Sequence, residues 1–288
     1  MNRISNCGIL LFTFLISGCA MNWQASWETV RPKSSPADVQ PLLQQATTAY
    51  AAAVDGSTVD AGLAAYERVL DADPTNYRAL VDSAALLILR GTSYTTNSSR
   101  KSDYFYRAMR YAELAMYTNP VFRARADAGS VPWEAADTLG AAEAEAMLFW
   151  VTALQYEFKE GMSLPSKIIN IVWLQRALVF LDRIEAVAPE FGGGAVEFSK
   201  VICYIALPES RGGSKQKGDE YMQKAIVKGD GWLLPRWARG KYYYAIKGDV
   251  EKGRQDLAWV ATQPLELYKD AYPWRIHFRN DARDILGK

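Results

Sequence analysis

Apolar residues recur at intervals of three and four along almost the whole chain, and this spacing constrains the fold more than any other feature. Residues at these intervals lie on one face of an α-helix, and that face is expected to meet a core. Alternating apolar and polar residues, which would predict strands, are almost absent. The sequence therefore predicts an all-α protein. The clearest stripes are Val39, Leu42, Leu43, Ala46, Tyr50 and Ala53; Leu63, Tyr66, Val69 and Leu70; and Tyr77, Leu80, Val81, Ala84 and Ile88.

Proline-containing breaks separate the predicted helices. They lie at Asp73-Pro74-Thr75-Asn76, Thr118-Asn119-Pro120 and Ala188-Pro189-Glu190. Proline disfavours continued helix, so each break predicts a tight turn. The glycines from Gly192 to Gly194 predict a sharp reversal with positive φ. The polar residues from Thr92 to Lys101 predict an inserted loop.

The helices before these breaks carry alanine, which lets a second helix approach closely. Paired helices of this kind that end in a proline turn resemble the tetratricopeptide repeat, and the match is best from Gly62 to Leu89. We therefore expect a tetratricopeptide-like array of helical hairpins, either an α-solenoid or a compact superhelix. Because the breaks are irregularly spaced, a generic helical bundle is the alternative.

The amino terminus resembles a bacterial lipoprotein signal. Arg3 supplies a positive charge, and the apolar run from Ile9 to Ile16 is far shorter than the roughly 20 residues that a spanning helix needs. Ile16-Ser17-Gly18-Cys19 then resembles a lipobox, which implies a signal peptide over residues 1–18 and acylation of Cys19. An ordinary secretory signal that contains a cysteine is the alternative.

Beyond the acylated cysteine, residues up to 34 are polar and lack sustained periodicity, so residues 19–34 are expected to form a flexible tether. Ser35-Pro36-Ala37-Asp38 offers a cap hydroxyl, a first-turn proline and an acid, which together predict a helix start. A single helical repeat domain is expected over residues 35–288.

Charge and cysteine content restrict the partners and the chemistry. The 33 basic and 32 acidic residues nearly cancel, so no overall field favours nucleic acid or an anionic membrane face. Recognition must depend on local features. Cys7 would leave with the signal and Cys19 would be acylated, which leaves Cys203 without an intramolecular disulfide partner. Its apolar neighbours predict a buried small hydrophobic residue.

Catalytic residues are scarce in this sequence. His277, the single histidine, lies between Ile276 and Phe278 and is predicted to be a packed or surface residue. We therefore predict no catalytic site, no metal site and no cofactor, and the protein is not expected to be an enzyme. An enzyme that acts on cell-wall polymer would need a cleft with two convergent carboxylates.

Aromatic residues make up 12% of the chain and supply the candidates for binding. Most are expected to anchor helices in the core. Successive helical positions point about 100° apart, however, so three consecutive tyrosines cannot all face one core. Some aromatic side chains could instead line an apolar groove or pore. The candidates for ligand or partner binding are Trp150, Tyr204, Trp237, Tyr242, Tyr243 and Tyr244.

A combination of motifs in the second half of the chain carries a family resemblance. They are Pro189-Glu190-Phe191-Gly192-Gly193-Gly194-Ala195, Tyr204-Ile205-Ala206-Leu207-Pro208, Gly212-Gly213 leading into Lys224-Ala225-Ile226, and Asn280, Ala282 and Leu286. From about Gly140 onward the chain resembles the T-component family of tripartite ATP-independent periplasmic (TRAP) transporters. Members of this family are lipoproteins with divergent tetratricopeptide-like helices.

The resemblance implies a periplasmic lipoprotein, anchored to the outer membrane, that is an accessory component of a solute uptake system. It would bind a solute-receptor protein, and a small apolar or carboxylate-bearing ligand in a helical groove or pore. A homo-oligomer, with a trimer preferred, is also expected. The alternative is a scaffold lipoprotein that assembles envelope proteins without handling solute. A cavity lined by Trp and Tyr would favour the first function, and an open polar groove the second.

The acylation of Cys19 can be tested directly. Cys19→Ala should release the protein from membranes, because each buried methylene of the acyl chains contributes about 0.8 kcal/mol to anchoring. Fractionation of cell membranes measures this, with Cys203→Ala as the control that should stay bound. Unchanged fractionation of Cys19→Ala would show that the anchor prediction is wrong.

Overall fold

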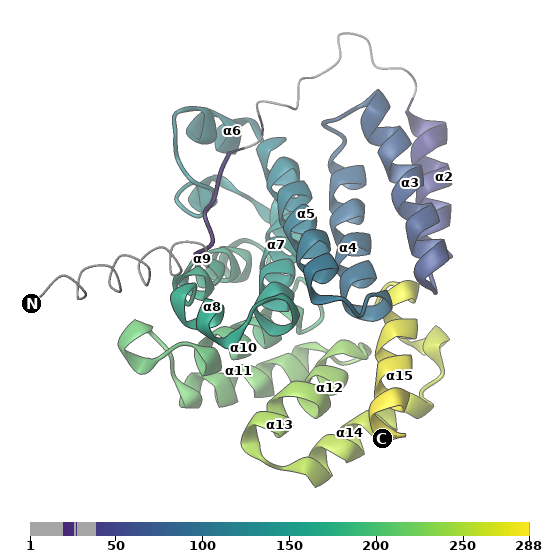
Figure 1. The fold of residues 1–288 in the computed structure, drawn as a ribbon, viewed down its shortest axis with the longest axis vertical. Coiled ribbons are helices and arrows are strands. Elements are labelled where there is room, and N and C mark those ends of the chain that lie inside the picture. Colours follow the sequence, from purple (N-terminus) through teal and green to yellow (C-terminus); the bar gives the residue numbers. More distant parts are fainter. Residues whose placement is uncertain (1–19, 26, 28–38, 288) are drawn as a thin grey trace, which may run out of the picture.

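The apolar stripes form helices, and each helix packs its stripe against neighbouring helices. The computed structural model describes residues 20–25, 27 and 39–287 (Figure 1). These residues contain no β-strand, so the prediction of an all-α helical array is confirmed. The predicted signal peptide, Cys19 and the predicted helix start at Ser35-Pro36-Ala37-Asp38 lie outside the described residues.

The array is built from helices that pack on their neighbours in the sequence, as Figure 1 shows. Five-residue π-helical segments follow α7 and α12, at Glu157–Gly161 (η4) and Arg239–Tyr243 (η6). The α-helices are α2 (Gln40–Ala51), α3 (Gly56–Ala72), α4 (Tyr77–Tyr94), α5 (Ser98–Tyr117), α6 (Pro120–Asp127), α7 (Ala144–Tyr156), α8 (Leu164–Ile169), α9 (Val172–Val187), α10 (Ala195–Ala206), α11 (Lys215–Lys228), α12 (Leu234–Ala238), α13 (Tyr244–Lys247), α14 (Val250–Thr262) and α15 (Tyr272–Leu286).

The three proline breaks separate helices as predicted. In the first two, an asparagine caps the helix that follows: the Asn76 side chain accepts a hydrogen bond from the Ala79 amide, and Asn119 caps α6. The prediction of an inserted loop from Thr92 to Lys101 is wrong. Helix α4 continues to Tyr94 and α5 begins at Ser98, because the Asn97 side chain caps α5 by accepting from the Arg100 amide.

The predicted glycine reversal is confirmed at the start of α10. Gly192, Gly193 and Gly194 have φ values of 84°, 53° and 86°. Space as well as conformation requires glycine here. A Cβ atom on Gly193 would lie 2.2 Å from the Trp232 ring, and one on Gly194 would lie 2.4 Å from the Ala225 carbonyl oxygen. The reversal therefore lets α10 and α11 pack closely against each other.

Contacts between the two ends of the array close it. Helix α15 packs against α2 and α4, and Figure 1 shows it beside the ends of the first helices. Trp274 of α15 packs against all three hydrophobic clusters of the molecule. His277, one turn further along α15, is buried, and its Nδ1 lies 2.7 Å from the Ser93 hydroxyl of α4. His277 is thus a packed residue, as predicted.

The predicted burial of Cys203 is confirmed. Cys203 is fully buried, and burial raises the pKa of its thiol to about 12, so it packs as a small hydrophobic residue. Among residues 20–25, 27 and 39–287, no helix is long and apolar enough to cross a bilayer.

The buried histidine predicts a specific loss of stability in acid. Burial lowers the pKa of His277 to about 4 from its ordinary value of 6.5, although Asp281 opposes the shift. Folding therefore favours the neutral ring. The contribution to stability is complete above pH 6.5 and is lost as pH falls toward 4, by about 3 kcal/mol.

Urea unfolding at a series of pH values measures this loss. Between pH 6.5 and 4, the wild-type protein should lose about 3 kcal/mol more free energy of unfolding than His277→Gln. Equal losses in the two proteins would contradict the assignment.

Candidate functional site

The first described residues lie against the helical domain and not away from it. Residues 20–25 and 27, called the docked segment here, appear in purple in Figure 1, running from α9 to α6. The Met21 amide donates to Asn170 Oδ1 at 2.6 Å, and the Trp23 indole donates to Glu113 Oε1 at 2.9 Å. A flexible tether was expected over residues 19–34, but its described part is docked.

Two tryptophans explain why this segment docks. Trp27 is buried and stacks on Tyr117 with ring centroids 5.1 Å apart, and it meets Phe122 edge to face. Trp23 meets Trp133 edge to face at 6.1 Å. Aromatic pairs contribute about 0.5–1.5 kcal/mol each beyond the area they bury. These contacts offset the entropy lost when the segment is ordered.

A buried carboxylate joins the docked segment to two helices. Tyr106, Met109, Arg110 and Glu113 lie three and four residues apart on one face of α5. Glu113 Oε1 also accepts from the Trp150 indole of α7 at 2.9 Å, while Arg110 pairs with Oε2 and donates to the Gln24 carbonyl at 2.8 Å. Burial raises the pKa of Glu113 to about 7, although Arg110 and both indoles oppose the shift.

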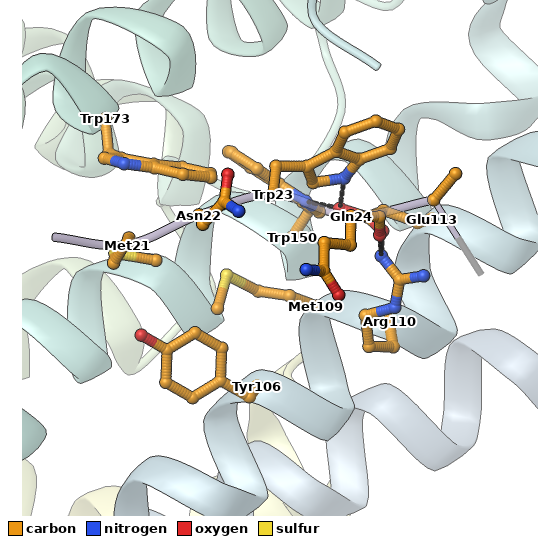
Figure 2. A pocket seen from close by; sticks show the side chains of 11 residues that line it. Met21, Asn22, Trp23, Gln24, Tyr106, Met109, Arg110, Glu113, Trp150 and Trp173 are labelled. Atoms are coloured by element: carbon orange, nitrogen blue, oxygen red, sulfur yellow. Dashed lines mark hydrogen bonds and ion pairs between the residues drawn. The ribbon is translucent and has the colours of Figure 1, made fainter. Parts of the chain in front are cut away.

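The docked segment and helices α5, α7 and α9 line a cavity of about 250 Å³ that is partly open to solvent. Figure 2 shows the Trp23 indole and the Arg110 guanidinium converging on Glu113 in its wall. The lining is dominated by aromatic and methionine side chains. The residues of this aromatic cavity are Met21, Asn22, Trp23, Gln24, Ala25, Tyr106, Met109, Arg110, Glu113, Trp150 and Trp173.

A layer of packed rings supports the wall of the aromatic cavity. Trp150 lies 4.9 Å from Phe180 and 6.3 Å from Trp173, measured between ring centroids. The Arg176 guanidinium covers the outer rings, 4.1 Å from Trp133 and 4.3 Å from Trp173. Close-packed rings have few alternative rotamers, so the wall is held in one shape.

The arrangement is suited to binding. Glu113 is the one carboxylate among the described residues that line the cavity, and both of its oxygens already accept hydrogen bonds. Glycoside hydrolysis would need a second carboxylate within reach. No cluster of three metal-ligating side chains occurs in the part of the chain that the structure describes. What the cavity offers is a mainly apolar surface with one ion pair at its edge, between buried Glu113 and partly exposed Arg110.

The structure brings one of the predicted binding residues, Trp150, into the cavity. The other five candidates lie elsewhere, and their role in binding stays a prediction. Tyr204 stacks on Tyr221, while Trp237 packs on Phe278 and Tyr242 on Trp237. The Tyr243 hydroxyl donates to Asp219, and Tyr244 lies beneath Arg239. All three consecutive tyrosines are half-buried, so none is confined to a core.

Sequence reasoning missed Trp23, Arg110 and Glu113. A signal for Trp23 was available, because two tryptophans four residues apart are unexpected in a solvated tether. No comparable signal marked Glu113, since a glutamate on an amphipathic helix looks like any other solvated residue.

Comparison with known proteins adds no assignment: no protein-family model and no curated protein sequence matches the chain.

Removal of one ring should release the docked segment. Trp23→Ala loses a hydrogen bond to a charged group and its aromatic contacts, together about 3 kcal/mol, so the Met21 amide should exchange its hydrogen about 100-fold faster. Hydrogen exchange of the Met21–Ala25 amides measures the change.

The matched control is Trp259→Ala, which removes a tryptophan that packs on Tyr268 and Arg236, outside the cavity. The control should leave the Met21 amide protected. Equal protection in wild type and Trp23→Ala would mean that the indole does not hold the segment.

Proposed function

We propose that the protein is a lipid-anchored accessory binding protein of the bacterial envelope. In this proposal, Cys19 carries the anchor, and the helical domain binds a solute-receptor protein of a tripartite ATP-independent uptake system. The domain also holds a small apolar ligand. The lipobox and the family resemblance support the anchor and the system. The observation that supports ligand binding is the aromatic cavity, which is closed in part by Trp23 of the docked segment.

The lining of the cavity favours an apolar ligand over a carboxylate. Trp150, Trp173 and Met109 present apolar surface, whereas the cation at the edge, Arg110, already pairs with Glu113. Arg110 Nη2 has no hydrogen-bond partner among the described residues, but a carboxylate at this donor would lie close to the negative charge of Glu113. Engineered apolar cavities of about 150 Å³ bind benzene, so a cavity of this size suits a somewhat larger apolar molecule.

The closure of the helical array argues against the alternative function, a scaffold that assembles envelope proteins. A scaffold of repeat type binds its partners along an open concave groove. Here α15 packs against α2 and α4, so contacts between the two ends restrict such a groove. This supports ligand binding over scaffolding. A homotrimer remains our prediction for the assembled state.

Capture of partners from native membranes tests the proposal. The tagged, acylated protein is crosslinked in cells, extracted with mild detergent and analysed by mass spectrometry. A periplasmic solute-binding receptor should be enriched, and native mass spectrometry should detect a small apolar molecule bound to the protein. A tagged lipoprotein of unrelated fold is the matched bait.

A variant that fills the cavity separates ligand binding from receptor binding. Met109→Phe reduces the volume of the cavity and should lower ligand occupancy without releasing the receptor. If only envelope-assembly or wall-remodelling proteins are recovered, and no ligand is bound, the proposed role in solute uptake is contradicted. The result would favour the alternative function, a scaffold lipoprotein.

A further inference from the structure

Helix α8 exposes apolar side chains that no part of the described chain covers. None of its six residues is buried. Leu164 is 71% exposed and Ile168 is 67% exposed, and because they are one turn apart they share a face of the helix. Ile169 adds a third exposed aliphatic side chain. These three residues are called the α8 patch. Single exposed aliphatic residues are common, but a cluster indicates a contact surface.

The docked segment begins beside this patch. Asn170, the residue that follows α8, accepts a hydrogen bond from the Met21 amide at 2.6 Å. Cys19 precedes Met21 by two positions in the sequence. Two residues span at most about 7 Å, so an acyl group on Cys19 starts close to the carboxyl end of α8.

The charges around the patch suit phospholipid headgroups. Lys167 lies on α8 and Lys159 in η4, just before it. The Lys167 ammonium donates to the Lys159 carbonyl at 3.4 Å, which holds the two residues together. Among the described residues, no ion pair joins either lysine to a carboxylate. The Lys159 ammonium lies over the Tyr242 ring, 5.7 Å from its centroid, and its charge is not neutralised there. Two cations beside an aliphatic surface match an anionic bilayer, in which the headgroups are charged and the acyl region is apolar.

We infer that the α8 patch inserts into the interfacial layer of the bilayer that holds the acyl anchor, with Lys159 and Lys167 at the headgroups. The inference rests on the proposed anchoring at Cys19. A docked segment makes it possible, because a domain tied this closely to its lipid cannot stand away from the membrane. Met21 and Tyr106 both line the aromatic cavity, so one end of the cavity would also lie near the bilayer.

A fluorescent label at Ile168 tests the insertion. Mature acylated Ile168→Cys, in which Cys203 is buried, takes a nitrobenzoxadiazole label at one position. The protein is reconstituted into phosphatidylcholine–phosphatidylglycerol vesicles that carry a doxyl quencher near the glycerol end of the acyl chains. Interfacial side chains reach this depth, so emission should fall by about twofold or more relative to vesicles without quencher.

The chain offers a matched control in Ile246, which is 60% exposed on α13, and Figure 1 shows this helix apart from the docked segment. A label at Ile246→Cys should keep its emission and stay accessible to aqueous iodide. Replacing Leu164 by Glu should reduce the quenching at position 168, whereas Leu267→Glu, at a residue 73% exposed, should not.

Flotation and quenching together distinguish a failure of patch insertion from a failure of the lipid anchor. A labelled protein that floats with vesicles but is no more quenched at 168 than at 246 overturns the inference and leaves the anchor intact. If the protein floats with the vesicles but aqueous iodide quenches the label at position 168, the inference is also overturned. The α8 patch would then bind something other than lipid. A protein that does not float overturns the anchor, and the inference with it.

Discussion

The buried carboxylate of Glu113 is the interaction on which the site depends. It accepts from indoles of the docked segment and of α7, and it pairs with Arg110 on its own helix. An unpaired buried carboxylate would cost several kcal/mol, so these donors are required for the charge to lie there. Because the donors come from three parts of the chain, satisfying Glu113 also fixes the position of α7 and of the docked segment against α5. The aromatic cavity exists between the elements so fixed.

The closure of the array has a different physical basis. Helix α15 meets the first helices through Trp274, which packs against all three hydrophobic clusters, and through the contact between His277 and Ser93. In an open solenoid each unit contacts only its neighbours, and its terminal faces stay apolar. Here the terminal faces cover each other. The cavity therefore lies in a domain whose helices are held from both ends, which limits how far its wall can move.

The aromatic cavity and the α8 patch lie at the two ends of the docked segment, and in our proposal the anchor on Cys19 precedes this segment. The docked segment connects them, since its first residues contact the end of α8 and its tryptophans contact the cavity wall and α6. A long tether would separate events at the membrane from events in the domain. A docked one couples them, because the same side chains that fix the segment also line the cavity. In the function we propose, this coupling would link ligand binding in the cavity to the attachment of the protein at a membrane.

Local chemistry in the sequence determined the helices, the turns and the glycine reversal. These features depend on interactions over a few residues, so they can be predicted from the order of residues alone. The interactions are the helical spacing of apolar residues, the proline breaks, the asparagine caps and the steric freedom of Gly192–Gly194. The burial of Cys203 followed from its apolar neighbours, and Trp150 was found because aromatic clusters are visible in a sequence. Where polar Ser98 and Ser99 suggested a loop, Asn97 instead started a helix. Only the tertiary structure decided that residues 20–25 and 27 dock, that Glu113 is buried and that α15 closes the array. Those contacts join residues 149, 90 and 184 positions apart, and helical periodicity carries no information about which distant faces will meet.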